Sequence, residues 1–268
     1  MEENKRFAIK NEIIKKYYQL FMLHIDLRLI VEKQMQRKLA IDKRNPEECV
    51  SVFLFGKSYK THGVIMELCK EGYGEDAGTL TRALFETAVN ILYITQEYSN
   101  KRATMYWEHE WVLRKILYES NFELINDAQN ITTEMINEVM DNAKEIILKY
   151  KGEGLDVKGL NWSGKSIKKM AEEVGLKSAY DSVYAQFSDI AHSRVSARNE
   201  YIREDETVFI VDTGPSERLL EIVLVSSFHF FLLIVGCWDK VQNLDIKSQL
   251  EALNLRYDTL VTEFNKHQ

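Results

Sequence analysis

Three polar residues on one strongly apolar segment are the first candidates for chemistry. Arg82, Glu86 and Asn90 stand four residues apart in the stretch AGTLTRALFETAVNILYI, so in a helix they share one face. If that face is exposed, Arg82 and Glu86 form an ordinary surface ion pair. The apolar residues around them cover so much of the helix that partial burial is at least as well favoured. A buried charge pair needs partners, either in a structural network or in a functional pocket.

The segment YDSVYAQFSDIAHSR supplies a second set of polar residues. Ser188 and His192 share a helical face, and Asp189 lies one turn before His192. Histidine exchanges a proton near neutral pH, and a neighbouring carboxylate can set its tautomer and raise its basicity. A lone histidine on a helix is more often a hydrogen-bonded structural residue. Our leading hypothesis is an internal polar site of Arg82, Glu86, Ser188 and His192, which binds a small ligand or is weakly catalytic.

One segment matches the sequence pattern of a phosphate-binding loop but lacks the secondary structure that such a loop requires. GLNWSGKS, residues 159–166, matches G-x-x-x-x-G-K-[ST], and VFIVD, residues 208–212, looks like an apolar strand that ends in a magnesium-binding Asp. A P-loop needs a strand before it and a parallel sheet around it, whereas this motif follows a predicted helix and a polar loop. We expect Ser163 to cap a short helix starting at Gly164, with Trp162 packed as an anchor.

Charge and cysteine content exclude several classes of protein. The chain of 268 residues has 35 basic and 41 acidic side chains, a formal net charge of -6, so no global positive field attracts DNA or anionic lipid. Cys49, Cys69 and Cys237 are odd in number and widely spaced, which fits neither a disulfide framework nor zinc ligation. We expect a cytoplasmic protein with no cofactor and no metal.

Residues 222–238 are nearly all apolar and approach the length that spans a bilayer. The segment also contains Ser226, Ser227 and His229, and it is flanked by Glu221 and Asp239. A short apolar segment with polar residues in its middle is more typical of a buried helix. We therefore expect a central core helix and no membrane partner.

Apolar periodicity predicts an all-α, multi-helix bundle. One long amphipathic helix is expected over residues 5–41, and a second apolar stripe widens its buried face through Ile14, Tyr18, Phe21, Ile25 and Leu29. Pro46 and Pro215 stand where the periodicity stops. Further helices are predicted over residues 46–70, 76–97, 100–126, 132–150, 165–173, 180–193, 215–238 and 241–266. At most one short strand or hairpin is expected, near residues 207–212.

No segment with the composition of a linker divides the chain, so one domain over residues 1–268 is expected. Within it we distinguish an N-terminal helix (1–45), a core (53–196) and a C-terminal helical pair (215–268). The long first helix and the acidic, helix-rich surface are compatible with a homodimer, although no heptad seam is present.

The core resembles a widespread bacterial family catalogued as a domain of unknown function. The resemblance covers residues 53–196 and rests on TLTRALFETAVNILYI, NWSGKSIKKMAEEVGL and YDSVYAQFSDIAHS. Arg82, Glu86, Trp162, Tyr184, Ser188 and His192 stand where the family's pattern has those residue types. The resemblance implies a helical fold in which WSGKS introduces a helix, and it implies no established activity.

A looser similarity is to HEPN ribonucleases, helical proteins of toxin and phage-defence systems whose signature is Arg, four to six residues, then His. Arg102 and His109 have this spacing. The resemblance implies that Arg102 would stabilise the scissile phosphate and His109 would act as general acid or base on the RNA 2′-hydroxyl, without a metal. RNA is then the partner, and a dimer usually completes the site. A third alternative is a protein-interaction module without catalysis.

Overall fold

A computed structural model describes residues 2–37, 41–97, 99–121, 131–205 and 208–266. The all-α prediction is confirmed, since helices make up nearly all of the regular structure. In chain order the elements are α1 (Glu2–Lys16), α2 (Tyr18–Met35), α3 (Pro46–Lys70), α4 (Gly74–Ile94), α5 (Ser99–Ser120), α7 (Thr133–Gly152), α8 (Ile167–Glu173), α9 (Lys177–Ala179), η1 (Tyr180–Tyr184), α10 (Ala185–Ala191), η2 (Val195–Glu200), β1 (Ile202–Asp205), β2 (Val208–Val211), α11 (Leu220–Gln242) and α12 (Lys247–Lys266).

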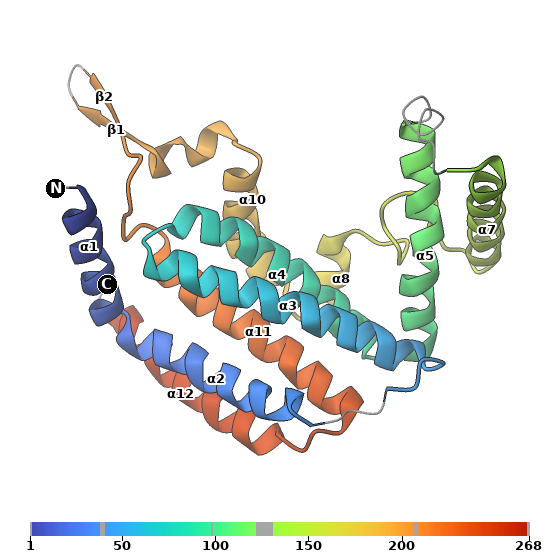
Figure 1. Cartoon of the computed structure of the whole chain (residues 1–268), viewed down its shortest axis with the longest axis horizontal. Helices are drawn as coiled ribbons and strands as arrows, with labels where there is room; N and C mark the ends of the chain where they lie inside the picture. The colour runs from blue at the N-terminus through green and yellow to red at the C-terminus, as the bar shows by residue number, and fades with distance from the viewer. Residues whose placement is uncertain (1, 38–40, 98, 122–130, 206–207, 267–268) are drawn as a thin grey trace.

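Helices α3, α4 and α11 form the centre of the molecule. Each packs on the other two, and α2 and α12 lie side by side across the outer side of α11 (Figure 1). Helix α11 buries residues all round its surface, among them Phe228, Phe231 and Trp238, as expected of a helix that is apolar on every side. Among the described residues, α11 is the one helix that has the length and hydropathy to span a bilayer. Within its apolar 18-residue stretch, 67% of the residues are buried inside the protein.

Helix α3 begins and ends where the sequence predicts. Asn45 caps it by accepting a hydrogen bond from the backbone N–H of Glu47, and Pro46 occupies the first turn, where it loses no helical bond. The carboxylates of Glu47 and Glu48 in that turn interact favourably with the positive end of the helix dipole. After α3 the chain reverses through Gly72, whose φ of 81° suits glycine.

Several features of the predicted helices are wrong, and α12 begins at Lys247 rather than at 241. The N-terminal segment is two helices, because the backbone breaks at Tyr17, whose ring is buried. On α2 the second apolar stripe is buried only in part, since Phe21 is buried whereas Tyr18, Ile25 and Leu29 are exposed. Helix α11 starts at Leu220 rather than at 215, after Leu219 in a left-handed conformation. The predicted 100–126 helix ends at Ser120, and its last residues lie outside the described ones.

Two parts project from this body. Helices α5 and α7 pack on each other as an arm on one side (Figure 1). Glu108 joins them, because it accepts hydrogen bonds from Lys149 at 2.8 Å and from the Tyr150 hydroxyl at 2.6 Å. At the opposite end, β1 and β2 form the antiparallel hairpin that the sequence allowed, with Ile202 opposite Val211.

Candidate functional site

The polar stripe of α4 is half-buried and has a partner on another element. Arg82 and Glu86 form an ion pair of 3.1 Å, and the Tyr184 hydroxyl joins both, since it donates to Glu86 at 3.0 Å and accepts from Arg82 at 3.3 Å. Burial raises the pKa of Tyr184. The Nε of Arg82 is buried and has no hydrogen-bond partner among the described residues. This three-residue network links α4 to η1.

Tyr184 belongs to η1, a short π-helical segment between α9 and α10. Single π-helical turns are rare and are often found at functional sites. Here the turn places the rings of Tyr180 and Tyr184 in a stack with centroids 4.8 Å apart. Farther along, Phe187 is fully buried against Gly78 of α4, where an added Cβ would lie 2.7 Å from the ring. The absence of a side chain at Gly78 therefore lets α10 approach α4 closely.

The other two predicted site residues do not enter this network. Ser188 is buried, but its hydroxyl donates to the carbonyl of Tyr184 at 2.7 Å, one turn back on its own helix. His192 is exposed at the end of α10. Asp189, proposed to set its tautomer, accepts hydrogen bonds from Arg194 and Ser196. Catalysis by the four residues together stays a prediction.

The far end of the stripe makes a second contact that the spacing did not predict. The indole N–H of Trp162 donates to the Asn90 side-chain oxygen at 2.7 Å, across 72 residues of sequence. The Trp162 ring also meets Tyr93 and Tyr106 edge to face, with centroids 5.9 and 5.2 Å away. Trp162 is therefore the anchor that the sequence predicted, and it fixes the loop before α8 against α4 and α5.

The phosphate-binding motif forms a helix start, although the predicted capping residue is wrong. Ser166, not Ser163, caps α8 by accepting from the N–H of Lys169 at 3.3 Å. Ser163 is buried and accepts from the N–H of Lys165. The Lys165 ammonium forms an ion pair with Glu173 at 2.7 Å. The lysine that would hold a phosphate is thus engaged with a carboxylate.

The two residues of the ribonuclease alternative lie on the arm helix α5 and are both engaged. The guanidinium of Arg102 donates to the carbonyl of Tyr93 and stacks over its ring at 3.9 Å. His109 is 3% exposed, and its Nε2 lies 2.9 Å from the Gly159 carbonyl, to which it donates. Burial lowers the pKa of His109, although hydrogen bonds to the Gly159 and Val157 carbonyls oppose the shift. RNA cleavage by this pair stays a prediction.

A cavity of about 490 Å³ lies where α3, α4 and α5 meet the loop around Trp162. Its wall is mostly apolar, with Leu113, Leu160 and four aromatic rings, those of Phe53, Tyr106, Trp107 and Trp162. Its polar groups belong to Asn90, His109 and Glu110. Phe53 and Trp107 are about half exposed, at 50% and 51%. Sequence reasoning missed Phe53, Tyr106 and Trp107. The aromatic run MYWEHEW could have drawn attention to α5.

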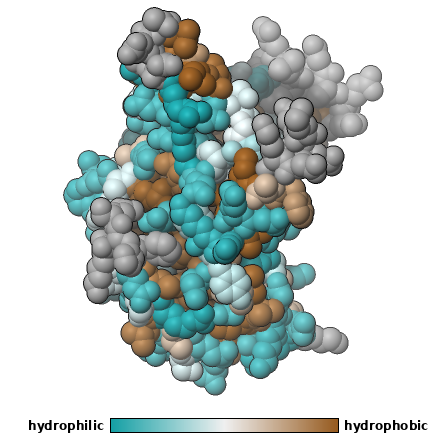
Figure 2. Space-filling view, turned by 90° about the vertical axis from the view of Figure 1, so that its left-hand side faces the viewer, coloured by the Kyte–Doolittle hydropathy of each residue, from teal (hydrophilic) through white to brown (hydrophobic). Residues whose placement is uncertain are grey.

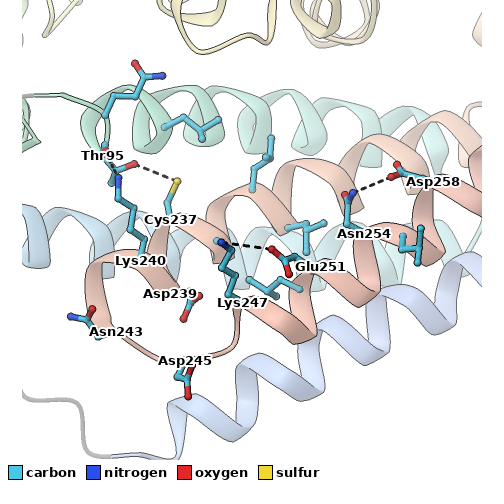
Figure 3. Close-up of a pocket in the computed structure, with 17 residues that line it drawn as sticks. Thr95, Cys237, Asp239, Lys240, Asn243, Asp245, Lys247, Glu251, Asn254 and Asp258 are labelled. Carbon is cyan, nitrogen blue, oxygen red and sulfur yellow. Dashed lines mark hydrogen bonds and ion pairs between the residues drawn. The ribbon is translucent and has the colours of Figure 1, made fainter.

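A larger cavity is an open groove of about 1150 Å³ between α11, α12 and the end of α4 (Figure 3). Several of its polar groups pair with one another along the rim. Lys240 donates to the Thr95 carbonyl at 2.8 Å, and Asn254 donates to Asp258 at 3.0 Å. Gly236 leaves the floor open, because an added Cβ there meets nothing within 4 Å. The aromatic cavity is smaller but more enclosed.

Comparisons with known proteins identify this chain only at the level of a family. The model of a family described as "Family of unknown function (DUF5677)" matches residues 48–209. No curated protein and no solved structure matches. In the part of the chain that the structure describes, no three His, Cys, Asp or Glu side chains are grouped to hold a metal ion.

Proposed function

Because the chain belongs to the DUF5677 family, whose function is unknown, we propose its role from geometry: it binds a small, neutral, planar molecule in the aromatic cavity between α3, α4 and α5. The observation that carries the proposal is the cavity itself, about 490 Å³ with four aromatic rings in its wall. Pockets for small ligands usually measure about 300–1,000 Å³ and combine apolar walls with few polar groups. The matched family region includes every residue that lines it.

The shape of the wall favours a flat ligand. Trp162 is fixed by its hydrogen bond to Asn90 and by its edge-to-face contacts, so its ring needs no ordering on binding. Phe53 and Trp107 expose half of their surface to water at the mouth. Covering such rings with a stacked aromatic molecule removes apolar area from water and adds ring–ring contacts.

The charges in the lining favour a neutral ligand. Glu110 is the carboxylate among the described lining residues, and Arg114 pairs with it at 3.0 Å. Burial lowers the pKa of His109, so that its ring is neutral near pH 7. A charged ligand would lose its hydration without gaining an unpaired counter-charge.

The test uses three planar probes of similar size: indole, benzoate and benzamidine. Saturation-transfer NMR should show contact of indole with the protein and weaker contact of the two charged probes. Leu160→Trp should abolish the indole signal, because Leu160 lines the cavity, is 75% exposed and can be enlarged without disturbing the core.

Leu255→Trp is the matched control, since Leu255 is 70% exposed and lines the groove of Figure 3 instead. It should leave the indole signal intact. The proposal fails if none of the probes binds, or if the indole contact survives Leu160→Trp.

A further inference from the structure

The β1–β2 hairpin exposes apolar side chains on both of its faces. It stands away from the helices at one end of the molecule (Figure 1), and apolar surface gathers at that end (Figure 2). All residues of β2 are exposed: Val208 at 56%, Phe209 at 69%, Ile210 at 43% and Val211 at 62%. An isolated two-stranded ribbon is marginally stable in water. A further strand along one edge would stabilise it.

The two edges of the hairpin differ in how well they are protected. Strand β1 has the sequence IRED, whereas β2 has the sequence VFIV. Charged residues on an edge strand oppose pairing with another strand, while a flat apolar edge favours it. The open edge of the hairpin is therefore that of β2.

The register shows which peptide groups that edge presents. The N–H of Asp212 donates to the carbonyl of Tyr201 at 2.8 Å, so these residues are a hydrogen-bonded pair. Hydrogen-bonded pairs alternate along an antiparallel ladder, which makes Ile210 and Val208 the next residues of β2 that bond to β1. The peptide groups of Phe209 and Val211 consequently face outward.

We propose that β2 pairs antiparallel with β2 of a second copy of this chain, about a two-fold axis at Ile210. The two-fold axis of such a pair runs perpendicular to the sheet, so side chains on one face of one copy stay on the same face in the other copy. Because side chains alternate between the faces, each residue pairs with a residue an even number of positions away in the sequence. With the axis at Ile210, Phe209 and the partner's Val211 exchange both hydrogen bonds, and so does the symmetric pair. An axis at Phe209 or at Val211 would pair only half as many of the outward groups of β2 with one another. The symmetric register thus selects Ile210.

The expected dimer is weak and depends on concentration. Three residues of β2 from each copy, Phe209, Ile210 and Val211, form the core of the contact, well below the total area of about 1,200 Å² that stable interfaces bury. The fit is nevertheless specific, since these three apolar residues meet one another across the axis and their free peptide groups are matched in number and direction. The hairpin lies apart from the aromatic cavity, so dimerisation does not depend on the ligand proposal.

Sedimentation velocity from low micromolar to submillimolar concentration tests the proposal. The mass should rise from 31.4 kDa toward twice that value. Ile210→Glu should keep the chain monomeric, because two carboxylates would lie opposite each other. Leu148→Glu, at an exposed leucine of α7, is the matched control and should dimerise as the wild type does.

Cysteine crosslinking tests the register. At the axis Ile210 forms a non-hydrogen-bonded pair, with Cα atoms about 4.5 Å apart, within the range of disulfides. In a Cys49→Ser background, Ile210→Cys should give a crosslinked dimer with diamide, and Val208→Cys should give far less. A chain that stays at 31.4 kDa at every concentration overturns the proposal, as does a dimer that Ile210→Glu leaves intact. Equal crosslinking at both positions overturns the register.

Discussion

The Nδ1 atom of His24 and the Nε2 atom of His62 lie 2.7 Å apart in the core, between α2 and α3. His24 Nε2 lies 3.0 Å from the carbonyl oxygen of Leu224, so it carries the proton and donates. Its Nδ1 is then an acceptor, and His62 Nε2 donates to it. The remaining His62 Nδ1 has no partner among the described residues. Both rings are fully buried, and burial in an apolar core favours the neutral form of each ring.

This pair should make the protein lose stability as the pH falls below about 6.5. Burial lowers the pKa of His24 to about 3 and that of His62 well below its usual range. In the unfolded chain both take up protons near pH 6.5. Between that pH and about 3 the unfolded state binds more protons, so the free energy of unfolding falls with pH, by up to about 1.4 kcal/mol per unit for each histidine.

Urea unfolding at about pH 6.5 and about pH 5 measures this dependence. His24→Gln keeps a donor and an acceptor but does not titrate, so it should remove the contribution of His24 to the pH dependence, up to about 1.4 kcal/mol per pH unit. His192→Gln, at the exposed end of α10, should leave it nearly unchanged. An unaltered dependence in His24→Gln would contradict the assignment.

Two helical glycines should respond to alanine in opposite directions. In Gly78→Ala the new Cβ would lie 2.7 Å from the ring of buried Phe187, and overpacking of this kind costs about 1–3 kcal/mol. In Gly236→Ala the Cβ meets nothing within 4 Å, and alanine should stabilise the helix by about 0.5–1 kcal/mol. Chemical denaturation of both variants measures the difference. If Gly78→Ala is as stable as the wild type, α10 does not need so close an approach to α4.

Removal of the indole N–H at Trp162 should cost stability. Trp162→Phe keeps an aromatic ring but leaves the side-chain oxygen of half-buried Asn90 without its 2.7 Å donor. A loss of about 1–2 kcal/mol is expected. Trp107→Phe, at a ring that is 51% exposed, should change stability by less than about 0.5 kcal/mol. Thermal unfolding of the two variants gives the comparison, and equal effects would argue against the bond.

The bridge between α4 and η1 should be measurable as a coupling energy. Tyr184→Phe and Glu86→Gln each alter the 3.0 Å hydrogen bond between the hydroxyl and the carboxylate. In a double-mutant cycle their effects should fall short of additivity by about 0.5–1 kcal/mol. Strict additivity would show that the two side chains do not interact in solution.

The parts of the fold that were predictable are those with local signals. Helix α3 begins at a capping Asn45 followed by Pro46, and both its ends match the prediction. No proline or glycine near Tyr17 signals the break between α1 and α2, and the ring of Tyr17 is buried in the core. Packing overrides a periodicity that runs without interruption through the break.

The candidate site was predictable only in part, for a similar reason. Spacing placed Arg82, Glu86 and Asn90 on one face of a helix, and the structure confirms that Arg82 and Glu86 pair. The partners of these side chains on other elements depend on long-range contacts, such as the hydrogen bond of Asn90 with Trp162, 72 residues away. The aromatic cavity depends on the angle at which α5 leaves α3 and α4, and no local pattern encodes that angle.

The aromatic cavity lies beside the middle of α5, and the second half of this helix extends beyond it. His109 lines the cavity and binds the loop at Gly159, whereas α7 packs mainly on α5. The end of α5 at Ser120 lies about 17 Å beyond His109, at about 1.5 Å per residue. A rotation of about 20° at the cavity would displace that end by about 6 Å. A change of the cavity's width too small to disturb the core would therefore be amplified at the far end of the arm.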